Sequence, residues 1–259
     1  IMKDQLNRDI QITEIPKRIV SLVPSQTELL YDLGLETSIV GITKFCVHPN
    51  HFLKSKTVVG GTKQIKLEKI KALQPDIILC NKEENTEEIV RACENISVVH
   101  VSDIRTIQDC IDMIYQYGEI FKKQEDASEI SEAIQINLNA FNLFITGKPV
   151  MNVAYFIWKN PWMVAGKNTF INYLLELNRY KNPYKNLGRY PELNMKLNDS
   201  IDLVLLSSEP YPFKENHIEE LQKYYTKAHI HLIDGEMFSW YGSRLIQAFS
   251  YFKSLRLNL

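Results

Sequence analysis

The sequence predicts an α/β protein with two Rossmann-like lobes of similar organisation, each built around a mainly parallel sheet. Short apolar runs typical of buried strands alternate with amphipathic segments between residues 19 and 101. The same alternation starts again after Pro149. Between the two series lies one long segment without glycine or proline, bracketed by Gly118 and Gly147. These three observations predict two lobes and a helical connection.

The first lobe starts with an apolar strand that Pro24 ends. Ser25, followed three residues later by Glu28, has the spacing of a capping box, which predicts that a helix starts there. The rest of the lobe repeats these patterns. In chain order we expect strand 19–23, helix 25–33, strand 38–42, strand 57–59, helix 67–73, strand 76–79, helix 86–92 and strand 97–101.

The segment 119–147 predicts one long connecting helix, because its apolar residues recur at three- and four-residue spacing. These residues are Ala127, Ile130, Ile134, Leu138, Phe141 and Phe144. The alternative is a crossover helix inside a single larger sheet. The new series of strands after Pro149 favours two lobes, so we divide the chain into a lobe 1–118, the helix 119–147 and a lobe 148–259.

The second lobe follows the same rules. Its expected elements are strand 150–156, helix 169–177, strand 201–206, helix 216–224, strand 229–233 and helix 239–251.

Composition limits the function. The 259 residues are 45% hydrophobic and 24% charged, as in soluble globular proteins. Thirty basic residues against 31 acidic ones give a net charge of −1, so we expect no nucleic-acid partner. No apolar run is long enough to span a bilayer, so we expect no membrane insertion. We expect a monomer.

The start of the chain and its cysteines bear on location. No signal-peptide pattern or lipid-anchor cysteine is visible before Cys46, so the sequence as written predicts a cytoplasmic protein, and a periplasmic one if a leader has been removed. The four cysteines share no C-x-x-C spacing and read mainly as buried core residues. They favour a reducing compartment.

No common nucleotide-binding or hydrolase motif is present, so the sequence gives no support to those two classes of function. Instead, polar and aromatic clusters follow the predicted strands. Since the carboxyl ends of parallel strands meet at one edge of a sheet, these clusters are candidates for ligand binding. In the first lobe they are Phe45, His48, Thr62, Lys63, Glu83, Glu84 and Asn85.

The second lobe contributes a more aromatic set. Its candidates are Trp158, Glu209, Tyr211, Glu236, Phe238, Trp240, Tyr241 and Arg244. Trp158, Trp162 and Trp240 all follow strands and fit an apolar platform for a large flat ligand, with core packing as the alternative. Arg244 either anchors an anionic group or pairs with Glu236.

Metal binding is an alternative hypothesis to the ligand site. Cys46 and His48 offer a thiolate and an imidazole, which suit zinc or copper, and Glu83 with Glu84 offer carboxylates. The structural alternatives are a loop pair and solvated acids in the first turn of a helix. In the metal reading, the chain is a cytosolic metal- or corrinoid-handling protein or a metalloenzyme without permease docking. A third hypothesis is that the lobe surfaces chiefly bind a protein partner.

Several segments carry a resemblance to a known family. They are 16–25 (PKRIVSLVPS) with 27–29 (TEL), 40–43 (VGIT), 59–61 (VGG), 67–70 (LEKI), 73–76 (LQPD) and 238–244 (FSWYGSR). Over residues 16 to 252 the chain resembles the helical-backbone, or class III, solute-binding proteins of ABC transporters, in the cobalamin and iron-siderophore branch.

The resemblance implies two lobes, one rigid helix behind them and a ligand held in a cleft between the lobes, without a reaction. It implies a bound corrinoid or iron chelate and no intrinsic cofactor. Phe45 occupies the position of an aromatic residue that touches the corrin in relatives, and residues 236–240 match a loop that lines their site.

The resemblance also implies docking to a membrane permease through one surface glutamate per lobe. Glu68 matches the first of these. The second lobe departs from the pattern, because segment 194–200 is about one turn shorter than in the family and Lys196 stands near the position where an acid is expected. The sequence therefore supports ligand binding more fully than permease docking.

Overall fold

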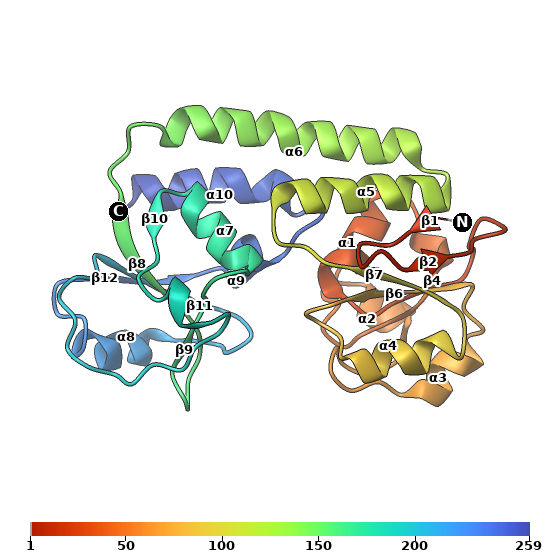
Figure 1. The fold of residues 1–259 in the computed structure, drawn as a ribbon, viewed down its shortest axis with the longest axis horizontal. Helices are drawn as coiled ribbons and strands as arrows, with labels where there is room; N and C mark the ends of the chain where they lie inside the picture. Colours follow the sequence, from red (N-terminus) through yellow and green to blue (C-terminus); the bar gives the residue numbers. More distant parts are fainter. Residues whose placement is uncertain (1) are drawn as a thin grey trace. The chain divides into compact units, whose positions relative to one another are not determined.

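The computed structural model describes residues 2–259 and divides the chain into two compact units. Unit 1 contains residues 1–135 and 241–246, and unit 2 contains residues 136–240 and 247–259. Each unit is built on its own five-stranded sheet with helices packed against it (Figure 1). The predicted α/β fold class is confirmed.

The sheet of unit 1 has the strand order β5-β4-β3-β6-β7, and every pairing in it is parallel. Helices α3 and α4 lie on one side of this sheet, and α1 and α5 lie on the other (Figure 1). Its strands are β3 (Ile19–Ser21), β4 (Ile39–Ile42), β5 (Thr57–Val58), β6 (Ile77–Asn81) and β7 (Val98–Ser102). Its helices include α1 (Pro24–Asp32), η1 (Glu36–Ser38), α2 (Phe52–Ser55), α3 (Leu67–Ala72), α4 (Glu87–Glu94) and α5 (Ile107–Phe121).

A short hairpin of β1 (Met2–Lys3) and β2 (Asp9–Ile10) covers the edge strand β7. Asp4, between the two strands, is buried and accepts hydrogen bonds from the Val101 amide at 3.1 Å and from Arg8 Nε at 2.8 Å. The sequence analysis did not predict this hairpin, because two-residue strands leave no periodic pattern. It satisfies backbone groups that an open sheet edge would expose.

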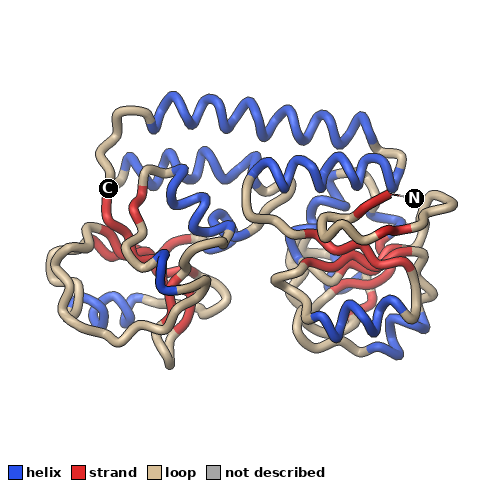
Figure 2. The backbone as a smooth tube through the Cα atoms, viewed as in Figure 1, coloured by secondary structure: helices blue, strands red, loops and turns tan. Residues whose placement is uncertain are grey.

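Unit 2 has the order β10-β8-β11-β12, with β9 antiparallel to β8. Figure 2 shows the strands of this sheet between helices. The strands are β8 (Met151–Trp158), β9 (Met163–Val164), β10 (Tyr180–Lys181), β11 (Leu203–Ser207) and β12 (His229–Ile233). The helices are α7 (Phe170–Leu177), η2 (Lys185–Leu187), α8 (Glu215–Gln222), α9 (Gly235–Ser239) and α10 (Leu245–Leu257). The first residues of α10 are assigned to unit 1.

The predicted connecting helix is α6 (Gln124–Ile145), and the division between the units falls inside it. It starts later than position 119, because residues 107–121 form the separate helix α5, which the sequence analysis missed. Gly118 lies within α5, where an added Cβ would lie 2.8 Å from the Cβ of Ala127. The glycine therefore allows α5 and α6 to approach closely. The chain turns between them at Lys122, whose φ is +55°.

Two predictions about helices are wrong: the capping box of the first helix and the continuous helix 239–251. Helix α1 starts at Pro24 with Val23 as its N-cap residue, and no side chain caps it, so Ser25 and Glu28 form no capping box. The helix predicted over 239–251 is broken instead. Helix α9 ends at Ser239, residues 241–244 pass through unit 1 without helical structure, and α10 starts at Leu245. In the segment between the two helices, Tyr241 and Arg244 are buried and hydrogen-bond to Gln26 and Glu28 of unit 1.

No helix among residues 2–259 is both long and apolar enough to cross a membrane.

Candidate functional site

The carboxyl edge of the unit 1 sheet presents an exposed aromatic ring. Phe45 follows β4, and 49% of its surface is exposed. Lys44 Nζ lies 5.0 Å from the centroid of this ring, and an ideal Cβ at Gly61 would lie 3.3 Å from its edge. The Lys44 amide donates to the Gly60 carbonyl at 2.8 Å, which ties the loop after β4 to the loop after β5. The backbone of the loop that carries Phe45 is thus tied to the neighbouring loop, and about half of the Phe45 surface faces solvent.

The loop after β6 is fixed by two asparagines. Asn81 Oδ1 accepts hydrogen bonds from the amides of Glu83 at 2.9 Å and Glu84 at 3.1 Å. Buried Asn85 accepts from the Asn81 amide at 2.9 Å through Oδ1. Its Nδ2 donates to the carbonyls of Leu22 at 3.2 Å and Thr62 at 3.0 Å. Both ends of the Asn85 amide are therefore occupied by protein, so it positions the loop.

The structure brings four of the predicted residues together at this edge. Asn85 contacts Thr62, and Lys63 Nζ donates to the carbonyl of Glu83. The Lys63 side chain is exposed, and Glu83 is half-buried. We call Lys44, Phe45, Thr62, Lys63 and Glu83 the unit 1 edge cluster. It combines an aromatic face, two ammonium groups and a carboxylate.

A buried polar network lies at the same end of the unit 1 sheet. The Tyr117 hydroxyl donates to Gln26 Oε1 at 2.6 Å, and Gln26 Nε2 donates to Ser102 Oγ and, at 3.3 Å, to the Tyr241 hydroxyl. Burial raises the pKa of Tyr241, so its phenol is neutral near pH 7. The sequence analysis missed Gln26, although the four consecutive polar residues 25–28 at the start of a helix were a usable signal.

Tyr241 and Arg244 lie in unit 1, although the sequence analysis placed them with the second lobe. Arg244 is buried, and its Nε donates to Glu28 Oε1 at 2.9 Å. The sequence analysis expected Arg244 to anchor an anionic group or to pair with Glu236, whereas the observed partner is Glu28. Its guanidinium is occupied by a protein carboxylate, so we do not retain it as a ligand anchor.

The predicted half-site for metal is occupied by protein partners. Cys46 is buried, with its sulfur 3.2 Å from Thr27 Oγ1 and 3.3 Å from Thr43 Oγ1, and burial raises the pKa of its thiol. His48 is half-buried and precedes a cis peptide bond to Pro49. Within residues 2–259 no group of three or more His, Cys, Asp and Glu residues is placed to hold a metal ion. The metal reading gains no support from this geometry.

In unit 2, Glu209 organises the carboxyl edge of the sheet. Its Oε1 accepts hydrogen bonds from Trp240 Nε1 at 2.8 Å and from Ser239 Oγ at 2.9 Å. Burial raises the pKa of the Glu209 carboxyl, an effect that these hydrogen bonds partly offset. Trp240 is buried, and Glu236 lies in the first turn of α9, with its amide donating to Asp234 Oδ1 at 3.0 Å.

The three tryptophans do not form one exposed platform. Trp158 is 39% exposed and meets Tyr211 edge to face, with 5.7 Å between the ring centroids. Trp162 instead stacks on Phe213 and packs against the core. Trp158 and Tyr211 are therefore the aromatic candidates of unit 2 that reach its surface.

Phe238 is a core residue. It is fully buried, and its ring centroid lies 5.5 Å from that of Tyr155 and 4.6 Å from that of Phe252. Since its ring already packs against other rings, we do not retain it as a ligand contact.

The predicted docking residue Glu68 lies in the first turn of α3. Its side chain is 85% exposed and forms an ion pair of 2.9 Å with Lys71. In unit 2, segment 194–200 contains no helix, and Lys196 is exposed. The exposed glutamate of α3 and the non-helical segment 194–200 agree with the difference between the two lobes that the sequence analysis noted.

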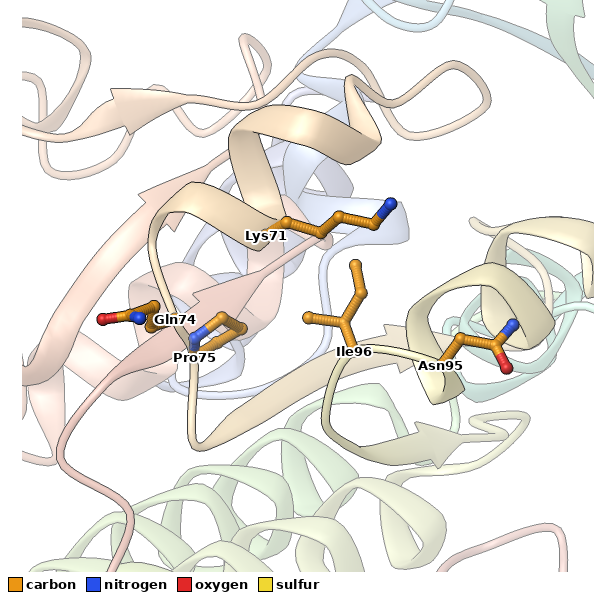
Figure 3. A pocket seen from close by; sticks show the side chains of 5 residues that line it. All are labelled: Lys71, Gln74, Pro75, Asn95 and Ile96. Atoms are coloured by element: carbon orange, nitrogen blue, oxygen red, sulfur yellow. The ribbon is translucent and has the colours of Figure 1, made fainter.

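A pocket of about 390 Å³ lies at the opposite edge of the unit 1 sheet, before the start of β6 and β7 (Figure 3). It is lined by Lys71, Gln74, Pro75, Asn95 and Ile96. None of these residues belongs to the unit 1 edge cluster. A smaller pocket of about 160 Å³ in unit 2 is lined by Tyr184, Tyr225 and residues 193–198.

The chain is similar to bacterial binding proteins. A lipoprotein of Bacillus subtilis described as an uncharacterised ABC transporter substrate-binding lipoprotein is 27% identical over 187 residues, which cover 69% of this chain and 59% of that one. A vitamin B12-binding protein of Vibrio campbellii is 26% identical, with coverages of 59% and 56%. The alignments thus span less than two thirds of these relatives' own lengths. Such relatives and structural neighbours are described as lipoproteins or periplasmic proteins, so they do not support the expected cytoplasmic location of this chain.

Solved structures show the same fold. The periplasmic vitamin B12-binding protein of Vibrio cholerae matches with a TM-score of 0.79 and 15% identity, covering 95% of this chain and 99% of that one. A periplasmic haem-binding protein of Pseudomonas aeruginosa matches with a TM-score of 0.80 and 20% identity, covering 93% and 92%. The family model described as periplasmic binding protein matches residues 19–222. The chain therefore belongs to the periplasmic binding protein family.

Proposed function

We propose that this protein is the non-catalytic solute-binding component of an ABC-type importer and that its solute is a metal chelate: a corrinoid, a haem or an iron chelate. It acts outside the cytoplasm, delivers the chelate to a membrane permease and carries no cofactor of its own. Membership of the periplasmic binding protein family supports the binding role. The printed names of its relatives and structural neighbours support this range of solutes.

The observation that carries the proposal is the half-exposed ring of Phe45 at the carboxyl edge of the unit 1 sheet. This edge is where open α/β sheets bind ligands. An aromatic face beside glycine backbone suits a flat apolar ring system, because both surfaces can approach it closely. Lys44, whose ammonium lies 5.0 Å from the ring centroid, adds positive charge beside that face.

The polar part of the unit 1 edge cluster fits the periphery of such a ligand. Lys63 can pair with a carboxylate or phosphate substituent, and the Glu83 side chain can accept hydrogen bonds from amide or hydroxyl groups. Asn81 and Asn85 hold the loop that carries Glu83, so these polar groups need little reordering when a ligand binds. In unit 2, the aromatic side chains that reach the surface are Trp158 and its neighbour Tyr211.

The test is a calorimetric titration of the purified chain with cyanocobalamin, haemin and a ferric hydroxamate siderophore. The proposal expects one of them to bind with 1:1 stoichiometry and micromolar or tighter affinity. If none of the three binds when protein and ligand are mixed at about 100 µM, near 100-fold above that affinity, the chelate proposal is wrong.

A further inference from the structure

Helix α6 carries apolar side chains on two of its faces. One face is covered, with Ile134 and Phe141 buried. On the other face Ile136 is 67% exposed, Leu143 is 83% exposed, and Ala140, between them, is exposed as well. With about 3.6 residues per turn, these three positions fall on one side of the helix. We call Ile136, Ala140 and Leu143 the outer strip of α6.

The outer strip differs from the rest of the described surface. Among residues 2–259, Leu143 is the most exposed of the large apolar side chains, and Ile136 is the next most exposed. Single exposed apolar residues are common, but two neighbouring ones beside an alanine on one helix face form a patch. The covered face already packs α6 against its own chain. Because a second apolar face buries surface only against a second partner, the strip indicates an interaction surface.

Opposite charges lie at the two ends of the outer strip. Residues 124–132 contain four acids and no lysine or arginine, whereas residues 133–150 contain Lys148 and no acid. Lys148 and Lys253 both lie over the ring of Phe144, with 5.1 and 5.3 Å between each ammonium and the ring centroid. The strip therefore runs from an acidic end to a basic end.

We propose that the outer strip is the interface of a homodimer, in which α6 packs antiparallel to α6 of a second copy of this chain. The antiparallel direction brings the acidic end of each helix beside the basic end of the other, whereas a parallel pair would bring like charges together. The inference is independent of the proposed function, since no residue of the unit 1 edge cluster takes part. The sequence analysis expected a monomer, and a strip of three residues is too short to give the coiled-coil pattern that would indicate otherwise.

The positions of the outer strip fit a two-fold axis between residues 139 and 140. This axis places Ile136 of one copy beside Leu143 of the other, so the two largest side chains of the strip form two equivalent contacts. Ala140 lies next to the axis, where its small side chain allows the two helices to approach closely. Exposed Glu129 then lies within ~3 Å, measured along the helix, of Lys148 of the second copy. One register thus satisfies both the apolar contacts and the charges.

Sedimentation velocity of the purified chain measures the association. The proposal expects a dimer with a Kd of about 100 µM or lower. Leu143→Glu puts a carboxylate into the apolar contact and should raise this Kd at least about tenfold. Leu187→Glu is the matched control, because Leu187 is 63% exposed in the same unit but lies on η2, outside the strip. The control variant should dimerise like the native chain.

Charge reversal tests the pairing without changing the apolar residues. Glu129→Lys and Lys148→Glu each place like charges opposite one another, so each variant alone should dimerise about fivefold or more weakly at low ionic strength. An equimolar mixture of the two variants restores opposite charges at both contacts and should form heterodimers with nearly the native Kd. Since neither Glu129 nor Lys148 is buried, these variants decide the question if Leu143→Glu fails to fold.

Cysteine cross-linking tests the direction of the helices. In the antiparallel dimer the two copies of position 140 lie side by side, whereas the two copies of position 136 lie about 10 Å apart along the helix, beyond the reach of a disulfide. Under a mild oxidant, Ala140→Cys should therefore give a covalent dimer and Ile136→Cys should not, since the four native cysteines are buried.

Four results would overturn the proposal. They are a chain that stays monomeric up to about 200 µM, an unchanged Kd in Leu143→Glu, a mixture of the charge variants that associates no better than each alone, and a covalent dimer of Ile136→Cys.

Discussion

Arg244 holds Glu28 at two points: its Nε donates to Glu28 Oε1 at 2.9 Å, and its Nη2 contacts Glu28 Oε2. Both side chains are buried. Glu28 lies in α1, whereas Arg244 precedes α10. The ion pair therefore links the segment 241–246 to the rest of unit 1. Asp32 lies close enough for Arg244 to lower its pKa, although burial, the larger effect, raises it.

The first prediction concerns this ion pair. Arg244→Met leaves a buried carboxylate without its counter-charge and should lower the free energy of unfolding by about 3–5 kcal/mol. The double variant Glu28→Gln and Arg244→Met should lose less than the two single variants together, since it leaves no unpaired charge. Urea unfolding measures all three. Arg91→Met is the control, because Arg91 and Glu87 form an exposed pair whose loss should be barely measurable. Additive losses would contradict the coupling.

The second prediction concerns pH. Because burial raises the pKa of Glu209 above its ordinary value of 4.5, the folded state binds this proton more tightly than the unfolded state. The contribution of Glu209 to stability is therefore highest below pH 4.5 and falls as the pH rises through the folded-state pKa. In Glu209→Gln the amide oxygen still accepts from Trp240, and this fall should disappear. Urea unfolding between pH 4 and pH 8 measures the free energy of unfolding of both proteins. If the two plots of this free energy against pH run parallel, Glu209 does not titrate with a raised pKa in the folded state.

The third prediction compares two glycines. Gly60 has a φ of +126°, and an added Cβ would overlap the Gln64 carbonyl and lie 2.9 Å from Ile65 Cα. Gly147 also has a positive φ, but an added Cβ there would meet nothing within 4 Å. Gly147→Ala should therefore cost about 1–2 kcal/mol from backbone strain alone, and Gly60→Ala should cost more. Gly60→Ala should also weaken ligand binding, because the Gly60 carbonyl holds the loop of Phe45. Equal losses in the two variants would mean that the loop adapts to the Cβ.

The fourth prediction tests permease docking. Glu68→Lys reverses an exposed charge without touching the unit 1 edge cluster, so it should leave chelate affinity unchanged and reduce stimulation of the permease's ATPase activity. Glu87→Lys is the matched control, because Glu87 is also an exposed acid in the first turn of a helix with a basic residue one turn later. If both variants stimulate the permease as well as the native protein does, Glu68 has no part in docking.

The sequence was sufficient for elements with strong periodic patterns. Strand β6 and helix α7 were predicted to within two residues, because long apolar runs and clear caps define them. Helix α1 shows the limit of local rules. Its Ser25 and Glu28 match a capping box, but Glu28 binds a residue more than two hundred positions away.

The site was predicted in part. Phe45, Thr62, Lys63 and Glu83 were identified as residues that follow strands, and the parallel sheet does bring them together. Their roles as ligand contacts stay predictions. Phe238 and Arg244 follow the same pattern, yet they are buried against Phe252 and Glu28. A sequence pattern locates a residue at a strand end, but it does not tell whether the side chain turns toward solvent or toward the core.

The central claim is that the exposed ring of Phe45 binds a metal chelate, and the most direct measurement is the calorimetric Kd of Phe45→Ala beside that of Tyr115→Ala. Tyr115 is similarly exposed, at 44%, but lies on α5. For whichever chelate binds, the account predicts that Phe45→Ala weakens affinity roughly 5- to 10-fold through lost stacking, while Tyr115→Ala leaves the Kd unchanged. An unchanged Kd in Phe45→Ala, or an equal loss in both variants, would contradict it.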